Sequence, residues 1–258
     1  MLEFVGVALR RGAQPVLEGL DFDAPRGRIT GLLGQNRAGV AELVALAGGV
    51  MRPSGGRILL EGAALGATPM AAAAQGVARC ARRPRGIVGL TVMQQAMTGG
   101  FVHRPGFLAS LLWLPGARRA ERALAKRVRG LLAQAGLAAQ AEAPAVRLRP
   151  AEAWRLEIVR ALAAEPRLLL LEAPSAALRP ADCAALGEWL RGLCAAGLTV
   201  LVAERNMEFV AAQCDHAVVL HHGRKLAEGA PRACLDRPEV QEALLGRQQD
   251  ADRIRARQ

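Results

Sequence analysis

The spacing of hydrophobic positions divides the chain into a strand-rich first third, a helical middle and a last third in which strands and helices alternate. Near the start, apolar residues occupy short runs of strand length, separated by turn signals at Gly12 and Gly27. The predicted strands cover 2–9, 16–25, 28–34 and 56–62. Residues 40–49 instead have helical spacing and end in a glycine pair, which predicts a helix.

From about residue 91 the pattern changes to long helical stretches. The predicted helices cover 91–100, 117–137 and 150–166, and Gly136 is placed to cap the second of them. After Pro166 the predicted elements are a strand at 167–174, a helix at 180–197, a strand at 198–204, a short helix near Met207 and strands within 216–229. Wholly apolar strands that alternate with helices favour a parallel sheet covered on both faces, interrupted once by a helical insertion.

The composition adds that the chain folds as a globular protein. It has 258 residues, of which 52% are hydrophobic, enough for a substantial core. The longest apolar runs fall short of the ~20 residues of a membrane-spanning helix. The N-terminal stretch lacks the order of a secretory signal, so a cytoplasmic protein is expected.

The formal charge of +11 raises nucleic-acid binding as a hypothesis. The positive charge is nearly all arginine and is spread along the chain, and there is no tyrosine to stack on bases. The five cysteines form no C-x-x-C pair and have no metal-ligand spacing with the histidines. His221 and His222 are adjacent, and adjacent side chains on a strand point apart, so this pair does not indicate a metal site either. We therefore expect no nucleic acid and no bound metal in these places.

Several segments together resemble the ATP-binding cassettes of ABC transporters, most of all the cassette subunits of branched-chain amino acid importers. The resemblance rests on "RITGLLGQNRAG", "GVARCARRPRGIVGLTVMQQAM", "RLEIVRALAAEPRLLLLEAPSAALRP" and "GRKLAEGAP", and it covers nearly the whole chain. It implies an α/β fold with a P-loop (RecA-like) core, a mixed sheet and an inserted α-helical subdomain. The implied boundaries are 1–83 and 166–258 for the core and 84–165 for the helical subdomain.

The segment that resembles the phosphate-binding loop lacks the side chains that handle nucleotide. Gly34 and Gly39 have the spacing of G-x-x-x-x-G-K-[ST]. Val40 replaces the lysine and Ala41 replaces the hydroxyl that ligates Mg²⁺, whereas Arg37 stands where the family has glycine. The backbone at Gly34, Asn36, Ala38 and Gly39 is the expected nucleotide contact, which predicts weak ATP binding.

The remaining positions implied by the resemblance are altered as well. Glu172 occupies the position of the Mg²⁺-binding aspartate but is one methylene longer, so we expect poor geometry for the metal. Ala173 replaces the glutamate that orients the attacking water, and Arg205 replaces the switch histidine. The other replacements are Arg82 for the coupling glutamine, Arg11 for the adenine-stacking aromatic residue, and Leu148-Arg149-Pro150-Ala151-Glu152 for the signature loop.

The sequence therefore predicts an ABC cassette subunit that is catalytically impaired or inactive. The resemblance implies integral-membrane permease subunits and a second cassette as partners, in a homo- or heterodimer at the inner face of the membrane, without insertion into it. The groove around 82–105 is the expected permease contact, with Arg82 and Arg85 facing the partner. Two alternatives stay open: an active ATPase that uses Arg37 and Glu172 as substitutes, and a basic nucleic-acid-binding module.

Overall fold

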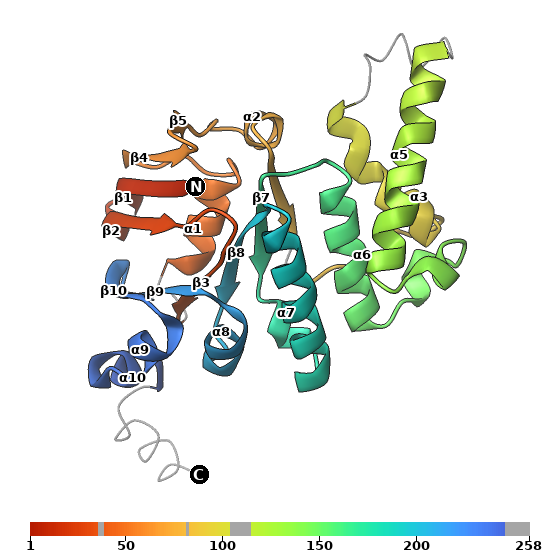
Figure 1. Ribbon diagram of the computed structural model, residues 1–258. Coiled ribbons are helices and arrows are strands. Elements are labelled where there is room, and N and C mark those ends of the chain that lie inside the picture. Colours follow the sequence, from red (N-terminus) through yellow and green to blue (C-terminus); the bar gives the residue numbers. More distant parts are fainter. Residues whose placement is uncertain (36–38, 81–82, 104–114, 246–258) are drawn as a thin grey trace.

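The computed structural model describes residues 1–35, 39–80, 83–103 and 115–245. Within these residues the strands form two sheets, and a group of helices extends to one side of them (Figure 1). The α/β class with a mixed sheet and a helical insertion is confirmed. The structure adds that the N-terminal strands make a separate antiparallel sheet.

The four-stranded sheet contains β1 (Leu2–Arg11), β2 (Gln14–Ala24), β4 (Gly55–Leu60) and β5 (Ala63–Ala64), in the order β2-β1-β4-β5. Its neighbouring strands are all antiparallel. The buried positions of β1 change from even to odd numbers, from Phe4 to Val7, and a register irregularity lies between these two residues. Gly6 lies there with φ 55°, so the bulge keeps Val7 and Leu9 on the buried face.

The six-stranded sheet contains the strands whose ends hold the positions linked above to nucleotide binding. It contains β3 (Ile29–Gly34), β6 (Val77–Cys80), β7 (Leu168–Glu172), β8 (Thr199–Glu204), β9 (His216–His221) and β10 (Arg224–Gly229), in the order β10-β9-β3-β8-β7-β6. All neighbouring pairs are parallel except β9 and β10. The carboxyl ends of β3, β7 and β8 therefore meet at one edge, where Gly34, Glu172 and Glu204 end their strands.

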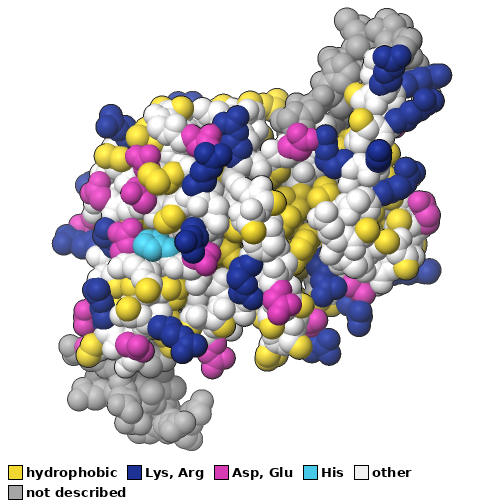
Figure 2. Space-filling view, viewed as in Figure 1, with side chains coloured by type: hydrophobic (Ala, Val, Ile, Leu, Met, Phe, Trp, Pro, Cys, Tyr) yellow, Lys and Arg dark blue, Asp and Glu magenta, His cyan; other side chains and the backbone are white. Residues whose placement is uncertain are grey.

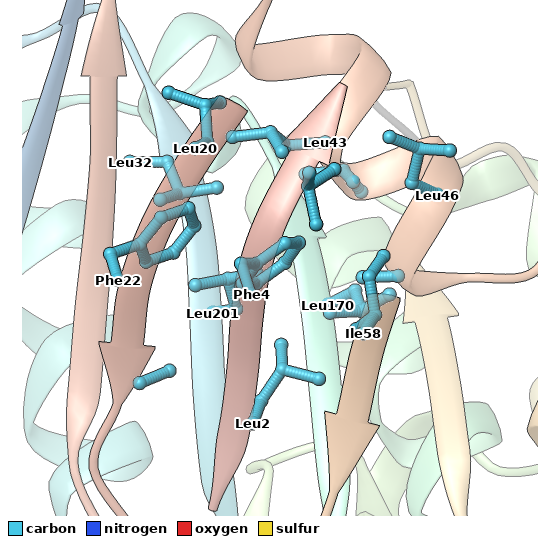
Figure 3. Close-up of a cluster of buried hydrophobic side chains, with 14 of the residues drawn as sticks. Leu2, Phe4, Leu20, Phe22, Leu32, Leu43, Leu46, Ile58, Leu170 and Leu201 are labelled. Carbon is cyan, nitrogen blue, oxygen red and sulfur yellow. The ribbon is translucent and has the colours of Figure 1, made fainter. Parts of the chain in front are cut away.

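One hydrophobic cluster joins the two sheets through helix α1 (Val40–Ala47) (Figure 3). Phe4 of β1 stacks on Phe22 of β2, with ring centroids 4.3 Å apart. Leu43 and Leu46 of α1 pack in the same cluster as Leu170 and Leu201 of the six-stranded sheet. This packing fixes the start of α1 relative to the end of β3, the two elements that flank the glycine-containing segment.

The remaining helices of the core cover the six-stranded sheet or continue the chain beyond it. They are α2 (Pro69–Ala74), η4 (Pro174–Ala177), α7 (Pro180–Ala195), α8 (Met207–Gln213), α9 (Pro231–Leu235) and α10 (Pro238–Leu245). Leu186 and Leu190 of α7 pack with β7 and β8 in a second cluster, and Val240 of α10 packs with β9 in a third. None of the helices in the described part of the chain combines the length and apolar character needed to cross a membrane.

The helical insertion has a hydrophobic cluster of its own. Its elements are α3 (Val92–Met97), η1 (Thr98–His103), α5 (Pro115–Gln134), η2 (Ala138–Gln140), η3 (Ala145–Arg147) and α6 (Pro150–Leu162). Leu156 and Val159 of α6 face this cluster, whereas Trp154 and Ile158 of the same helix pack with the sheet. Gly136 has φ 69° just beyond α5, as expected for a residue that ends a helix. The domain boundaries at 83/84 and 165/166 stay predictions.

Candidate functional site

The glycine-containing loop lies between the end of β3 and the start of α1. Gly34 is the last residue of β3, and Gly39 precedes the first turn of α1 with φ 92°. This φ favours glycine, and a Cβ on Gly39 would also meet Cδ2 of Leu17 at 2.2 Å, so that side chain would have to shift. Asn36, Arg37 and Ala38 lie outside the described residues. The sequence interpretation of Gly39 as a loop glycine therefore has a physical reason, and the contact of Gly34 and Gly39 with nucleotide stays a prediction.

Val40 and Ala41, the first two residues of α1, have no side-chain group that binds phosphate or metal. Val40 is half-buried and packs against the cluster between the sheets, and Ala41 is exposed. Glu42 in the same turn lies 3.5 Å from the guanidinium of Arg11. The helix N-terminus still favours an anion, but Glu42 already places a negative charge in that turn.

Glu172, in the position expected for the Mg²⁺ ligand, is paired with an arginine of the neighbouring strand. Nε and Nη2 of Arg79 on β6 both lie 2.5 Å from Oε1 of Glu172 at the end of β7. The side chain of Glu172 is 17% exposed and that of Arg79 is 36% exposed. The charge that would attract a cation is therefore compensated within the protein, which weakens the case for a metal site.

Removing Arg79 should destabilise the fold through this pair. We expect Arg79→Ala to lower the free energy of unfolding by about 1–2 kcal/mol, because Glu172 would keep a partly buried charge without its partner. Urea unfolding of Arg79→Ala, Glu172→Ala and the double variant should give a coupling energy of about 1 kcal/mol. The control is the exposed pair of Arg167 and Glu61, which should show a smaller coupling. Equal couplings would contradict a structural role for Glu172.

Ala173 follows Glu172 in the position expected for the glutamate that orients water. It has φ 48°, and its N–H donates to the carbonyl of Ala203 on β8 at 2.7 Å. This places the backbone of Ala173 firmly at the edge of the sheet while its methyl group offers no proton acceptor. The fold therefore holds the backbone of Ala173 in place, but its side chain cannot act as an acid or a base.

A carboxylate that the sequence interpretation missed lies at the end of β8, next to β3. Glu204 is 2% exposed. It accepts hydrogen bonds from the backbone N–H and the hydroxyl of Ser175, both at 2.8 Å, and from the N–H of Arg205 at 3.1 Å. The N–H of Asn206 lies 3.4 Å away. The signal in the sequence is an acidic residue that ends an apolar strand, followed by the helix-capping Asn206.

Arg205, in the position of the switch histidine, contacts the loop through Gln35. Its Nη2 lies 3.4 Å from Oε1 of Gln35. The amide nitrogen of Gln35 donates to the backbone carbonyl of Leu244 in α10. The start of the loop is thereby joined to the strand end at β8 and to the last described helix. Neither the guanidinium of Arg205 nor the amide of Gln35 can accept a proton from water in the way that a histidine can.

The segment in the position of the signature loop forms the start of α6. Pro150 is the first helical residue, and Glu152 turns back to accept from the N–H of Arg149 at 2.9 Å and from its guanidinium at 2.7 Å. Hydrogen bonding to the side chain of Arg149 lowers the pKa of Glu152 to about 2, although burial opposes the shift. Glu152 therefore acts here as a buried cap of its own helix.

The lowered pKa of Glu152 predicts a loss of stability in acid. Its pKa falls from 4.5 in the unfolded chain to about 2, so the stabilisation is complete above pH 4.5 and disappears as the pH falls towards 2. Because the Arg149 side chain is 76% exposed, we expect only about 1–2 kcal/mol. The advantage of the wild type over Glu152→Gln in urea unfolding should be present at pH 5.5 and smaller at pH 3. An unchanged difference would contradict this role.

The sequence predicted that the side chains of His221 and His222 point apart, and this prediction is wrong. His222 leaves the strand with φ 48°, and the rings of His221 and His222 meet edge to face with centroids 4.1 Å apart. Burial and the neighbouring ring lower the pKa of His221. Among the described residues no group of three or more His, Cys, Asp or Glu side chains is arranged to hold a metal ion.

Comparisons with known proteins agree with this architecture. The ABC transporter family model matches residues 17–176. The chain is 30% identical over 249 residues to the high-affinity branched-chain amino acid transport ATP-binding protein BraF of Pseudomonas aeruginosa, covering 95% of this chain and 98% of BraF. It is 29% identical to LivG of Escherichia coli, which has the same description, with the same coverage.

Solved structures support the fold. The ADP conformation of an ATP-binding cassette of an ABC transporter superposes with a TM-score of 0.84 at 23% identity, covering 95% of this chain and 98% of that one. CbiO1 of Clostridium perfringens gives a TM-score of 0.79 at 21% identity, with coverages of 99% and 98%. The chain belongs to the ABC transporter family, as an ATP-binding-cassette subunit that resembles those of branched-chain amino acid importers.

Proposed function

We propose that this protein is a non-catalytic ABC cassette, which binds ATP weakly and does not hydrolyse it. The proposal rests on the observation that residues in the positions of nucleotide-binding side chains make contacts that stabilise the fold. Val40 packs into the hydrophobic cluster, and Glu172 is bound by Arg79. The strands and helices that surround a nucleotide site are present, whereas the side chains at these positions stabilise the fold.

The donor set does not fit Mg²⁺. An octahedral oxygen site needs ligands that are free to coordinate the ion. Ala41 has no oxygen in its side chain, and the carboxylate of Glu172 is held by a guanidinium. Ala173 supplies no base for water, so these described positions offer neither metal-based charge stabilisation nor a carboxylate that positions water for phosphoryl transfer.

The altered signature segment argues against a dimer in which this chain completes the nucleotide site of an active partner cassette. In the family arrangement, each cassette contributes its signature segment to the partner's nucleotide. Here Pro150 lacks an N–H, and Glu152 is tied to Arg149 as a helix cap. We infer that this chain completes neither composite site of a homo- or heterodimer, and that its contribution to an assembly is structural or regulatory.

The test is an ATP titration with and without Mg²⁺, followed by a turnover assay on the purified protein. We expect weak binding that Mg²⁺ does not strengthen and no Mg²⁺-dependent release of phosphate above a no-protein control. Turnover that Glu172→Ala abolishes would overturn the proposal and establish the alternative, an active ATPase with substituted motifs. That comparison is decisive because Glu172 is the remaining carboxylate in the position of a metal ligand.

We further propose that the protein docks on integral-membrane permease subunits at the inner face of the cell membrane, in an assembly related to amino acid importers. Both BraF and LivG are described as high-affinity branched-chain amino acid transport ATP-binding proteins. The segment expected to face the permease presents Ile87 and Val88, which are 47% and 87% exposed, beside exposed Arg85. Arg82 lies outside the described residues.

The buried amide of Gln95 holds this segment in place. Its Oε1 accepts from the N–H of Ile87 at 2.8 Å and its Nε2 donates to the carbonyl of Arg85 at 3.2 Å. Gly86 between them passes the backbone of Ala145 so closely that a Cβ would lie 2.2 Å from it. The exposed side chains are therefore presented on a fixed backbone, which lowers the entropic cost of docking.

Charge reversal at this segment should weaken permease association. We expect Arg82→Glu with Arg85→Glu, or Val88→Asp alone, to reduce co-purification with the permease subunits by at least about tenfold. The matched control is reversal of Arg52 and Arg57, two exposed arginines of which one precedes β4 and the other lies on it. Unchanged association of both test variants would contradict docking at this segment.

A further inference from the structure

Helix α5 presents a row of basic side chains on its outer face. The helix contains six basic residues and one acidic residue, Glu121. Arg119, Arg122, Lys126 and Arg129 are exposed, and at 100° per residue they fall within about a quarter of the helix circumference. We call these four residues the basic stripe. Figure 2 shows Lys and Arg side chains along the outer edge of this helix.

The rest of the helix fixes the direction in which the basic stripe faces. Leu124, Val128 and Leu132, on the opposite side of α5, are buried in the cluster of the helical insertion. Arg127, on neither face, forms an ion pair with Glu165. The apolar contacts thus anchor α5 and leave the stripe directed towards solvent.

The fold itself makes no use of the stripe's charge. In the described part of the chain, none of its four residues forms an ion pair with a carboxylate, in contrast to Arg149 and Arg160 of the same insertion. Like charges three and four residues apart, as in Arg122 and Lys126, destabilise a helix. A row of repelling charges held on a fixed face indicates an external anionic partner.

The shape and composition of the stripe favour an anionic lipid surface. Arg129 lies ten positions after Arg119, so the stripe extends along the helix axis for about 15 Å. It contains no aromatic side chain that could stack on a base.

We propose that the basic stripe binds the phosphate headgroups of anionic phospholipids, directly and without a permease. This contact goes beyond the permease docking proposed above, because it needs lipid alone. Each basic residue close to an anionic membrane surface strengthens binding about fivefold, so the four together supply on the order of several hundredfold. Binding should also weaken steeply as salt screens the charges.

The test is sedimentation of the full-length protein with vesicles of phosphatidylcholine, with and without 30% phosphatidylglycerol. We expect binding only to the anionic vesicles, falling at least about tenfold between 50 and 300 mM NaCl. The variant Arg119→Gln, Arg122→Gln, Lys126→Gln, Arg129→Gln should lose at least about tenfold in binding. Glutamine is a good helix former, so circular dichroism and thermal melting should show α5 intact.

A matched variant controls for net charge. Arg52→Gln, Arg57→Gln, Arg147→Gln, Arg232→Gln removes four exposed arginines elsewhere and should bind anionic vesicles within about twofold of the wild type. Equal loss in both variants would overturn the proposal, as would equal binding to neutral vesicles. Binding to duplex DNA without binding to anionic vesicles would overturn it in favour of nucleic acid. Because these vesicles contain no permease, failure here leaves the proposed permease docking standing.

Discussion

The double substitution Val40→Lys with Ala41→Thr should raise the affinity of the protein for Mg·ATP by about tenfold to a hundredfold. The lysine restores a charged hydrogen bond to phosphate, which contributes about 1.5–3 kcal/mol, and the threonine restores an oxygen for Mg²⁺. Gly39 already has the positive φ of a loop glycine, and α1 is fixed by the cluster beneath it. The variant should remain without turnover, since Ala173 still provides no carboxylate.

The substitution has a structural cost that can be measured separately. Val40 is half-buried, and a lysine there loses packing and places a positive charge at a helix N-terminus, so we expect a stability loss of about 1 kcal/mol without nucleotide. Calorimetric titration with Mg·ATP checks the affinity. The control is Val40→Met with Ala41→Val, which has similar shapes without the ammonium and hydroxyl. A gain in the control, or none in the test variant, would contradict the assignment of this loop.

Replacing Glu204 with alanine should cause the largest loss of stability at the site, about 2–4 kcal/mol. The carboxylate is buried and satisfies the N–H and hydroxyl of Ser175 and the N–H of Arg205. Removing it leaves these donors without a partner at the edge between β8 and η4. For a chain of this length, the expected fall in melting temperature is on the order of 10 °C.

Two further variants define the cause of that loss. Ser175→Ala removes one hydroxyl donor and should cost less than about 1 kcal/mol. Glu204→Gln keeps the size of the side chain and should fall between the two, because its amide NH₂ opposes some of the donors. Thermal melting checks all three. A melting temperature of Glu204→Ala within about 2 °C of the wild type would contradict the structural role of this carboxylate.

The pattern of apolar positions was sufficient to predict the class of the fold but not its division into two sheets. Alternation in β1 and β2 predicts strands with one buried face, yet it does not say which strands are neighbours. The irregularity between Phe4 and Val7 changes the buried parity, and its reason is the bulge at Gly6, which only the pairing with β2 shows. Likewise, the adjacency of His221 and His222 predicted rings that point apart, and the backbone of His222 brings them together.

The losses at the site were readable from the sequence because they concern the presence of chemical groups. Folding cannot give Val40 an ammonium, Ala41 a hydroxyl or Ala173 a carboxylate. What the remaining charged groups do was decided only by the tertiary structure. Arg79 and Glu172 are 93 positions apart, and Ser175 and Glu204 are 29 apart. A sequence pattern shows neighbours along an element, whereas these pairs form because parallel strands bring distant residues to one edge of a sheet.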